Sequence, residues 1–288
     1  MQFSWKKQTY KPIGKRQLNV TWQYIVLMVL AFVFIAPFLW LINTALKDTS
    51  ELAAYPIHWL PTVAQWNNFA QSFTVINFPA YAANSLVLAS MYATLITLSS
   101  SLVGFGFARL RGRGKRSLLL IMLSTLMLPS ILTVIPTYVL FARLNLIDTY
   151  WPWVLWGLAS SPFHVFLFRQ FFSAIPLALE EAAIIDGCSY FRMYCQIFLP
   201  LSFPVIATSF ILSFTWVWGD YITPSLFLSQ NNTTLAVAMS LGYTDGHGNI
   251  LTNVLAAGSV LYVLPVLLIF VFAQRYFVRG IVTSGVRG

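Results

Sequence analysis

Six stretches of this chain are each apolar over about 20 residues, the length that an α-helix needs to cross the hydrocarbon core of a bilayer. Inside a membrane the backbone N–H and C=O groups must be bonded within the protein, and a helix bonds them within one segment. The sequence therefore predicts an all-α membrane protein with six transmembrane helices. The expected spans lie at 22–46, within 79–108, within 117–142, and at 150–168, 201–219 and 254–274.

Charged residues make up only 9% of the chain, against about 25% in soluble domains, as expected for membrane spans. The first apolar stretch begins near Trp22, is too long for the hydrophobic region of a signal peptide and lacks a convincing cleavage site. We therefore expect it to remain as the first span. The segment 48–77 has no Lys or Arg and is rich in Trp, Pro, Asn and Gln. We expect it to lie on the outer surface, with a short interfacial helix at 64–73.

Lys and Arg residues are distributed unevenly among the segments that join the spans. With the N-terminus inside, 15 of the 17 lie on the inner side, and only Lys47 and Arg143 lie outside. Because cytoplasmic segments are enriched in Lys and Arg, both termini are predicted to be cytoplasmic. The predicted organisation is a cytoplasmic tail at 1–21, a six-helix domain at 22–280 and a cytoplasmic tail at 281–288. The net charge of +9 does not indicate nucleic acid, because the basic residues are spread over four segments that contact anionic lipid.

An acidic loop, residues 173–200, interrupts the apolar sequence between the fourth and fifth spans, on the predicted inner side. Its acidic residues are Glu180, Glu181 and Asp186. Pro176 suits the first turn of a helix, the helix dipole favours acidic residues near that end, and Gly187 suits the position after the helix. We expect two short helices parallel to the membrane, which either rest on lipid or bind a soluble protein. The anionic inner leaflet disfavours acidic residues on lipid, which favours a protein partner.

Seven residues of the acidic loop stand at the spacing of a known signature. They are Glu181, Ala182, Ala183, Gly187, Ile197, Leu199 and Pro200. The pattern Glu-Ala-Ala, three residues, Gly, nine residues, Ile-x-Leu-Pro resembles the "EAA" signature of the permease subunits of bacterial ABC importers. Other segments resemble the carbohydrate branch of that family, and the chain is most similar to the maltose-type "G" permease. These segments are 84–86, 107–110, 144–150, 168–172 and 274–280.

The resemblance implies a type I importer in the bacterial inner membrane, with a second, different permease, two copies of an ATPase subunit and a solute-binding protein outside. It implies that the acidic loop is a coupling helix in a cleft of the ATPase, which switches the permeases between inward-facing and outward-facing states. Glu181 would face basic or polar groups, the two alanines after it would allow close approach, and Gly187 would set the turn. Residues 197–200 would fix the loop to the fifth span. The tail 281–288 either reaches the ATPase or is a frayed end.

Two tryptophans and a carboxylate stand together at the predicted outer end of the fifth span: Trp216, Trp218 and Asp220. Aromatic rings stack on sugar rings and a carboxylate accepts hydrogen bonds from sugar hydroxyls, so these residues are candidates for a substrate pathway. The alternative is a belt of interfacial tryptophans beside a solvated Asp. His164, in the fourth span, is expected to be a hydrogen-bonded contact between helices.

Motifs of enzymatic chemistry are missing from the sequence. There is no phosphate-binding loop, no HExxH or GxSxG motif and no cluster with metal-ligand spacing. We therefore expect no catalytic residue, cofactor or metal, with ATP hydrolysis in a partner subunit. The predicted function is import of a sugar or oligosaccharide; the alternatives are an importer of a non-sugar solute, a stand-alone secondary transporter and a membrane enzyme. Only His164 is ionisable and well inside a predicted span, which does not favour the secondary transporter.

Overall fold

The computed structural model describes residues 13–284, and the side chains of residues 20–274. In this range helices are joined by turns, and the extended backbone pairs only in an isolated antiparallel bridge between Thr244 and Ile250. This confirms the predicted all-α fold. The helices are α1 (Ile13–Ala45), α2 (Thr49–Leu52), α3 (Asn67–Thr74), α4 (Phe78–Arg109), α5 (Lys115–Ser124), η1 (Thr125–Met127, a 3-10 turn), α6 (Ser130–Arg143), α7 (Trp151–Leu158), α8 (Pro162–Ala174), α9 (Leu177–Ile185), α10 (Tyr190–Met193), η2 (Tyr194–Phe198, a π-helix), α11 (Leu199–Leu201), α12 (Phe203–Gly219), α13 (Ile222–Phe227), α14 (Leu235–Gly242) and α15 (Thr252–Ser284).

Three described helices are long and apolar enough to cross a membrane without a break: Val20–Ala45, Phe78–Arg109 and Thr252–Gln274. Three pairs of shorter helices pass the same test together but are bent at a short break. The pairs are Lys115–Met127 with Ser130–Arg143 (98°), Trp151–Ala174 with Leu177–Ile185 (77°), and Tyr190–Leu201 with Phe203–Gly219 (79°). The described residues thus contain three to six candidate spans, and the predicted six is reached when each bent pair counts as one span.

The predicted third span, within 117–142, is not one continuous helix. Leu128 has φ −81° and ψ 119°, an extended conformation, and α6 begins after Pro129. A proline disfavours helical backbone at the residue before it and has no N–H to continue the helix. The two halves of this segment therefore run in different directions, and the bend between them forms one wall of a cavity described below.

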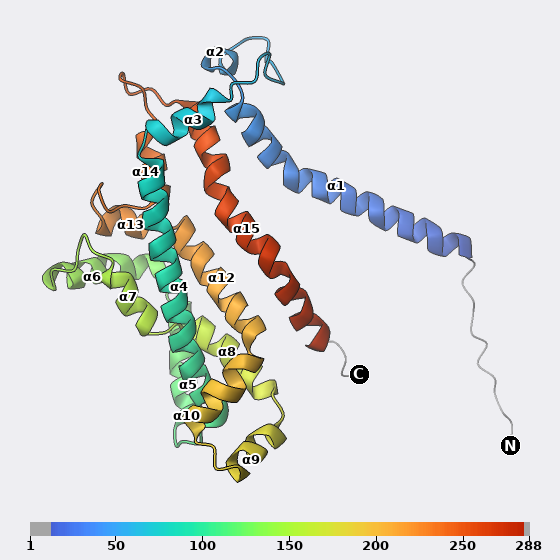
Figure 1. Ribbon diagram of the computed structural model, residues 1–288, viewed down its shortest axis with the longest axis vertical. Coiled ribbons are helices and arrows are strands. Elements are labelled where there is room, and N and C mark those ends of the chain that lie inside the picture. Colours follow the sequence, from blue (N-terminus) through green and yellow to red (C-terminus); the bar gives the residue numbers. More distant parts are fainter. Residues whose placement is uncertain (1–12, 285–288) are drawn as a thin grey trace.

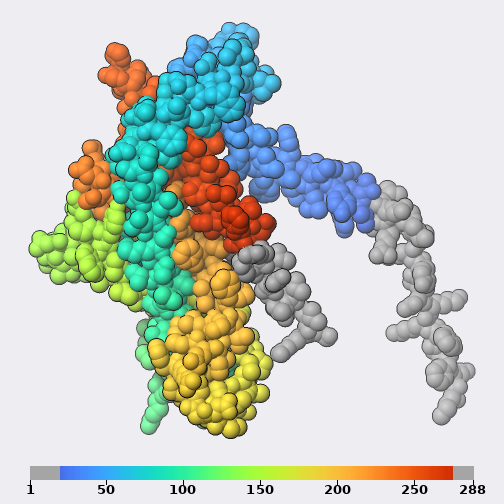
Figure 2. All heavy atoms as spheres, viewed as in Figure 1, coloured from blue at the N-terminus to red at the C-terminus, as the bar shows by residue number. Residues whose placement is uncertain are grey.

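Helix α4 is the centre of the bundle, and α7, α8 and α12 all pack against it (Figure 1). Its 32 residues correspond to a length of about 48 Å. Helix α1 packs against α15 near one end and then projects away from the body of the molecule (Figures 1 and 2). None of the most apolar 18-residue window of α1 is buried within the chain.

Two aromatic clusters lie at different levels of the bundle. The larger one joins α4, α7, α12 and α15 and includes Trp153, Phe214 and Trp218. The smaller one joins α4 and α8 to the acidic loop and includes Phe105 and Phe198, whose ring centroids are 5.0 Å apart. Because side chains of α9, α10 and η2 enter the smaller cluster, the acidic loop is packed onto the bundle rather than hanging from it.

The segment predicted to lie on the outer surface is ordered around polar contacts. The short helix expected at 64–73 is α3, and Asn68 at its start donates from Nδ2 to the backbone oxygens of Ala45 and Lys47, both at 2.9 Å. This segment and the acidic loop lie at opposite ends of the molecule (Figure 1). Residues 1–12 of the predicted N-terminal tail and 285–288 of the predicted C-terminal tail lie outside the described residues. The sides of the membrane stay a prediction.

Candidate functional site

The acidic loop begins where α8 ends and folds into two short helices. Pro176 is the N-cap residue of α9, one position before the first helical turn in which the sequence predicts it. The helix ends in a Schellman motif, in which the N–H of Cys188 donates to Ala183 O at 2.9 Å and the N–H of Gly187 donates to Ile184 O at 3.0 Å. Gly187 has φ +73°, a left-handed conformation that glycine adopts without strain. The predicted turn at Gly187 is confirmed.

After this turn, α10 begins at Ser189, whose Oγ accepts from the N–H of Arg192 at 3.4 Å. The chain then continues through the π-helix η2 and the short α11 into α12. Ile197 and Leu199, both half-buried, pack against the smaller aromatic cluster, and Pro200 is exposed in α11. These residues therefore lie at the junction with α12, where the resemblance places them.

The tip of the acidic loop presents apolar and acidic residues together. Glu181 and Ala182 are exposed, and Ile185 and Phe191 are 85% and 70% exposed. Ala183 is instead buried against the smaller aromatic cluster, so Ala182 is the alanine of the pair that a partner can reach. Exposed apolar side chains of this size beside charges are typical of a surface that binds another protein.

No pattern in the sequence indicates how the acidic loop is held. Arg109 at the end of α4 forms an ion pair with Glu180 of α9, across 71 positions of sequence. Its position after a predicted span suggested only a topology signal. A pairing between distant segments leaves no local pattern, and the only available clue was a lone acidic residue beside the signature residue Glu181.

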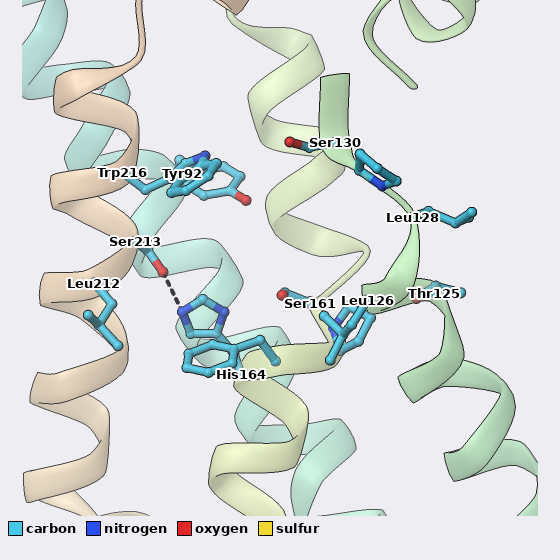
Figure 3. A pocket seen from close by; sticks show the side chains of 13 residues that line it. Tyr92, Thr125, Leu126, Leu128, Ser130, Ser161, His164, Leu212, Ser213 and Trp216 are labelled. Carbon is cyan, nitrogen blue, oxygen red and sulfur yellow. Dashed lines mark hydrogen bonds between the residues drawn. The ribbon is translucent and has the colours of Figure 1, made fainter. Parts of the chain in front are cut away.

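A cavity of about 680 Å³ lies between the bend of the third predicted span, α8, α12 and α4 (Figure 3). Its lining mixes apolar side chains with hydroxyl groups and one imidazole. The lining residues are Tyr92, Thr125, Leu126, Leu128, Pro129, Ser130, Ser161, Pro162, Phe163, His164, Leu212, Ser213 and Trp216. A cavity of this size and composition suits a small organic ligand.

His164 of α8 and Ser213 of α12 are hydrogen-bonded on one side of this cavity, with Nε2 and Oγ 2.9 Å apart (Figure 3). Both side chains are otherwise buried. This confirms the expectation that His164 joins two helices. The bond also holds the cavity's α8 and α12 walls together.

The three candidates for a substrate pathway do not lie together. Trp216 is 69% exposed and lines the cavity, whereas Trp218 is 2% exposed and stacks on Tyr262 with ring centroids 5.4 Å apart. Residues two apart on a helix point to different sides, which separates the two tryptophans. Asp220 follows the end of α12, where its Oδ1 accepts from the N–H of Thr223 at 3.2 Å. Of the three, Trp216 is the residue that lines the cavity.

Among the described residues, no group of three or more His, Cys, Asp or Glu side chains is arranged to hold a metal ion. Outside the spans, the hydrogen bonds that shift the pKa of Asp148 serve local structure. The pKa of Asp148 is held below its ordinary value of 3.8 by hydrogen bonds, first from the N–H of Ser229 and then from side chains that include Asn232. Asp148 thus fastens the connection between α6 and α7 to the loop after α13.

Residues 100–283 of the chain match the family described as "Binding-protein-dependent transport system inner membrane component". The chain is 31% identical over 274 residues to the "Lactose transport system permease protein LacG" of Rhizobium radiobacter, covering 94% of this chain and 97% of the relative. It is also 31% identical over 283 residues to the "Maltose/maltodextrin transport system permease protein MalG" of Vibrio vulnificus, covering 92% and 95%.

A solved structure has the same fold. The chain superposes with a TM-score of 0.77 on a chain of the "Crystal structure of a bacterial ABC transporter involved in the import of the acidic polysaccharide alginate", covering 94% of this chain and 100% of that one. The two chains are 19% identical. This likeness shows that the arrangement of helices is one that a transporter chain adopts.

Proposed function

Because the chain belongs to the family of binding-protein-dependent transport system inner membrane components, multi-pass permeases of ABC importers rather than enzymes, we propose that it forms half of the pathway through which a sugar or an oligosaccharide is imported. The pathway opens alternately to each side, and ATP hydrolysis in a partner subunit drives the change. ATP binding shifts this equilibrium only through different affinities for the two states, so a contact must carry the difference to the permease.

The observation that carries this proposal is the exposed tip of the acidic loop. The cytoplasmic location predicted from Lys and Arg places the loop on the side where ATP is available. We propose that Glu181, Ala182 and Gly187 contact the ATPase, while Ala183 and residues 197–200 hold the loop on the bundle. Two ATPase copies would serve two such loops, one from this chain and one from a second, different permease.

The second permease is supported by the exposure of α1. Its most apolar window is unburied within the chain, and it projects from the body of the molecule (Figure 2). We propose that the second permease and lipid share this surface. The predicted division into tails at 1–21 and 281–288 around a six-helix domain is part of the same proposal, as is a solute-binding protein at the opposite end from the acidic loop.

The docking role is tested by an aspartate at Gly187. Gly114 is a matched control, because it also has a positive φ, +77° against +73°, and in both cases an added Cβ would meet nothing within 4 Å. The backbone strain of Gly187→Asp and Gly114→Asp is therefore similar, and only the first lies in the acidic loop. We expect Gly187→Asp to leave the chain in the membrane and to abolish ATP-driven uptake, and Gly114→Asp to retain uptake. Normal uptake by Gly187→Asp would contradict the docking role.

The sugar assignment is supported by the relatives, which are named as permeases of lactose and maltose/maltodextrin transport systems, and by the cavity with Trp216. An indole ring beside hydroxyl groups suits a sugar, whose apolar face stacks while its hydroxyls form hydrogen bonds. The assignment is tested by the ligand of the solute-binding protein that co-purifies with the complex. A binding protein that takes amino acids or an inorganic anion and ignores sugars would overturn it.

A substitution separates the role of the cavity from that of the acidic loop. We expect Trp216→Ala to lower sugar uptake by roughly tenfold, the change that follows when a stacked aromatic contact of about 1.4 kcal/mol is lost. Trp151→Ala is the control, because Trp151 is 56% exposed at the start of α7 and lies outside the cavity. Equal uptake by the two variants would show that Trp216 does not face the solute.

A further inference from the structure

Arg109, the last residue of α4, contacts the acidic loop through a buried guanidinium group. Its side chain is 4% exposed, and that of its partner Glu180 is 12% exposed. Arg109 Nη1 lies 3.2 Å from Oε2 of Glu180, in the first turn of α9. Because a buried ion is costly without partners, this pair is built into the structure rather than a surface contact.

The other end of the guanidinium group binds the end of α8. Arg109 Nη2 donates to the backbone oxygen of Phe172 at 2.6 Å and to that of Ile175. Carbonyl groups in the last turn of a helix lack some of their intrahelical partners, and a cation there also favours the negative end of the helix dipole. One side chain therefore binds the end of α8 and the start of α9 at the same time.

The face of the guanidinium group covers an aromatic ring on the far side of the acidic loop. The Arg109 Cζ atom lies 5.0 Å from the centroid of the Phe198 ring, a cation–π contact. Phe198 is fully buried and ends the π-helix η2. Arg109 thus contacts the chain before, within and after the two short helices, and all of these contacts converge on the end of α4.

We infer that Arg109 is a positioning residue that holds the acidic loop in one orientation on the end of α4, so that α4 moves when the ATPase moves the loop. This inference rests on the proposed function. The role needs the planar fork of arginine, because a lysine ammonium is a single point that does not match the carboxylate and both carbonyls together. Without the contacts of Arg109, a movement of the residues that touch the ATPase would be transmitted only weakly to α4.

The test uses the whole complex, with the second permease and the ATPase, in sealed liposomes, which keep the two sides of the membrane separate. Arg109→Gln removes the charge and Arg109→Lys retains it; Arg111→Gln is the control, because Arg111 is exposed two residues further on. Hydrogen exchange of the amides in α9 measures how firmly the loop is held. The second measurement uses a cysteine at Leu212, in the cavity, as the labelling site. Cys188→Ser and Cys195→Ser remove the native thiols. Labelling of the cavity cysteine is followed with an impermeant maleimide added from outside. Labelling with and without ATP and vanadate reports the opening of the pathway.

We expect Arg109→Gln to speed exchange in α9 by roughly tenfold and to remove most of the ATP-dependent rise in labelling, while the complex still hydrolyses ATP. Arg109→Lys should lie in between, and Arg111→Gln should match the unaltered complex. A merely structural role would lower the yield of complex and leave the labelling rise per ATP hydrolysed unchanged. Unchanged exchange in α9, or an unchanged labelling rise per ATP, in Arg109→Gln would overturn the inference.

Gly187→Asp in the same assay separates this inference from the proposed function. If Gly187→Asp removes the labelling rise and Arg109→Gln does not, docking at the acidic loop stands and the role of Arg109 is wrong. If Gly187→Asp leaves the rise intact, the docking role fails, and the inference about Arg109 is overturned with it.

Discussion

Gly104 lies where α4 packs against α8, and we predict that Gly104→Ala destabilises the bundle although alanine is the better helix former. A Cβ atom at this position would lie 2.6 Å from the Cβ of Phe168 and 3.1 Å from the backbone oxygen of Val165. Both of these atoms are fixed by the backbone of α8, so no side-chain rotation relieves the contact. The two helices would have to move apart.

Gly106, two residues further along α4, provides a matched control. A Cβ atom there would meet only the Cδ1 atom of Leu110 at 3.9 Å, an ordinary contact. In both variants the change from glycine to alanine gains about 0.5–1 kcal/mol of helix propensity. This gain cancels in the comparison, and the difference between the variants is the cost of overpacking alone.

The size of that cost follows from the distance. Carbon atoms in contact prefer about 3.5–4.0 Å, so α4 and α8 must separate locally by about 1 Å, and neighbouring contacts then lose a quarter to a half of their attraction. Overpacking of this kind costs about 1–3 kcal/mol. We therefore expect Gly104→Ala to be about 1–3 kcal/mol less stable than Gly106→Ala.

Unfolding in detergent micelles by titration with sodium dodecyl sulfate, followed by tryptophan fluorescence, measures this difference. Gly106→Ala should unfold at the same or a slightly higher fraction of the denaturing detergent than the unaltered chain, and Gly104→Ala at a lower one. Equal midpoints for the two variants would refute the reasoning, because they would show that α8 does not approach α4 at Gly104.

Two further predictions concern polar contacts between segments that are far apart in the sequence. Ser85→Ala removes the Oγ atom that accepts from the buried N–H of Leu235 at 2.8 Å. We expect the free energy of unfolding in the same titration to fall by about 1–3 kcal/mol, because that N–H is left without a partner. An unchanged midpoint would contradict this. Asp148, whose pKa is lowered chiefly by the N–H of Ser229, contributes stability that is complete above its ordinary pKa and is lost as the pH falls through the lower folded value. The midpoints of Asp148→Asn and the unaltered chain should therefore differ at about pH 5 and converge towards about pH 2; a constant difference would show that the Asp148 charge is not involved.

The sequence was sufficient where the signal is local. Long apolar stretches predict helices because no other single segment satisfies its own backbone in lipid. Gly187 predicts a helix end because its left-handed backbone needs glycine. In the same way, the cluster of polar residues after Lys47 predicted the short helix α3 to within a few residues.

The prolines show where a local signal stops being sufficient. Pro37, Pro136 and Pro265 lie inside helices, whereas Pro129 lies at a break with a 98° bend between the flanking helices. Proline therefore lies inside a helix at three positions and at a break at the fourth, because the packing of neighbouring helices determines whether the missing backbone hydrogen bond is compensated. The cavity beside this bend could not be predicted from the sequence, because it also depends on how neighbouring helices pack.

In the candidate site too, the local pattern could be predicted from the sequence and the contacts between distant segments could not. The spacing from Glu181 to Pro200 identified the acidic loop, but the burial of Ala183 and the ion pair from Glu180 to Arg109 depend on segments far apart in the chain. Trp216 and Trp218 were expected in one substrate pathway, but two positions apart on a helix they face different ways. Which of them faces the cavity depended on the packing of α12 against α4 and α15.

Polar contacts hold α4 at two levels. Near its start Ser85 accepts from the N–H of Leu235, and at its end Arg109 binds the acidic loop; 24 residues of helix, about 36 Å, separate the two. At this distance the losses of stability from Ser85→Ala and Arg109→Gln should add to within about 0.5 kcal/mol.

The effects on ATP-dependent opening should not add. If α4 carries the movement of the acidic loop to its other end, a break at either place interrupts the same connection, and the double variant should open no less than the more severe single variant. The cysteine-labelling assay measures this directly. Independent, multiplying losses would show that Ser85 and Arg109 act on separate processes, and that α4 is not the element that joins the two sides.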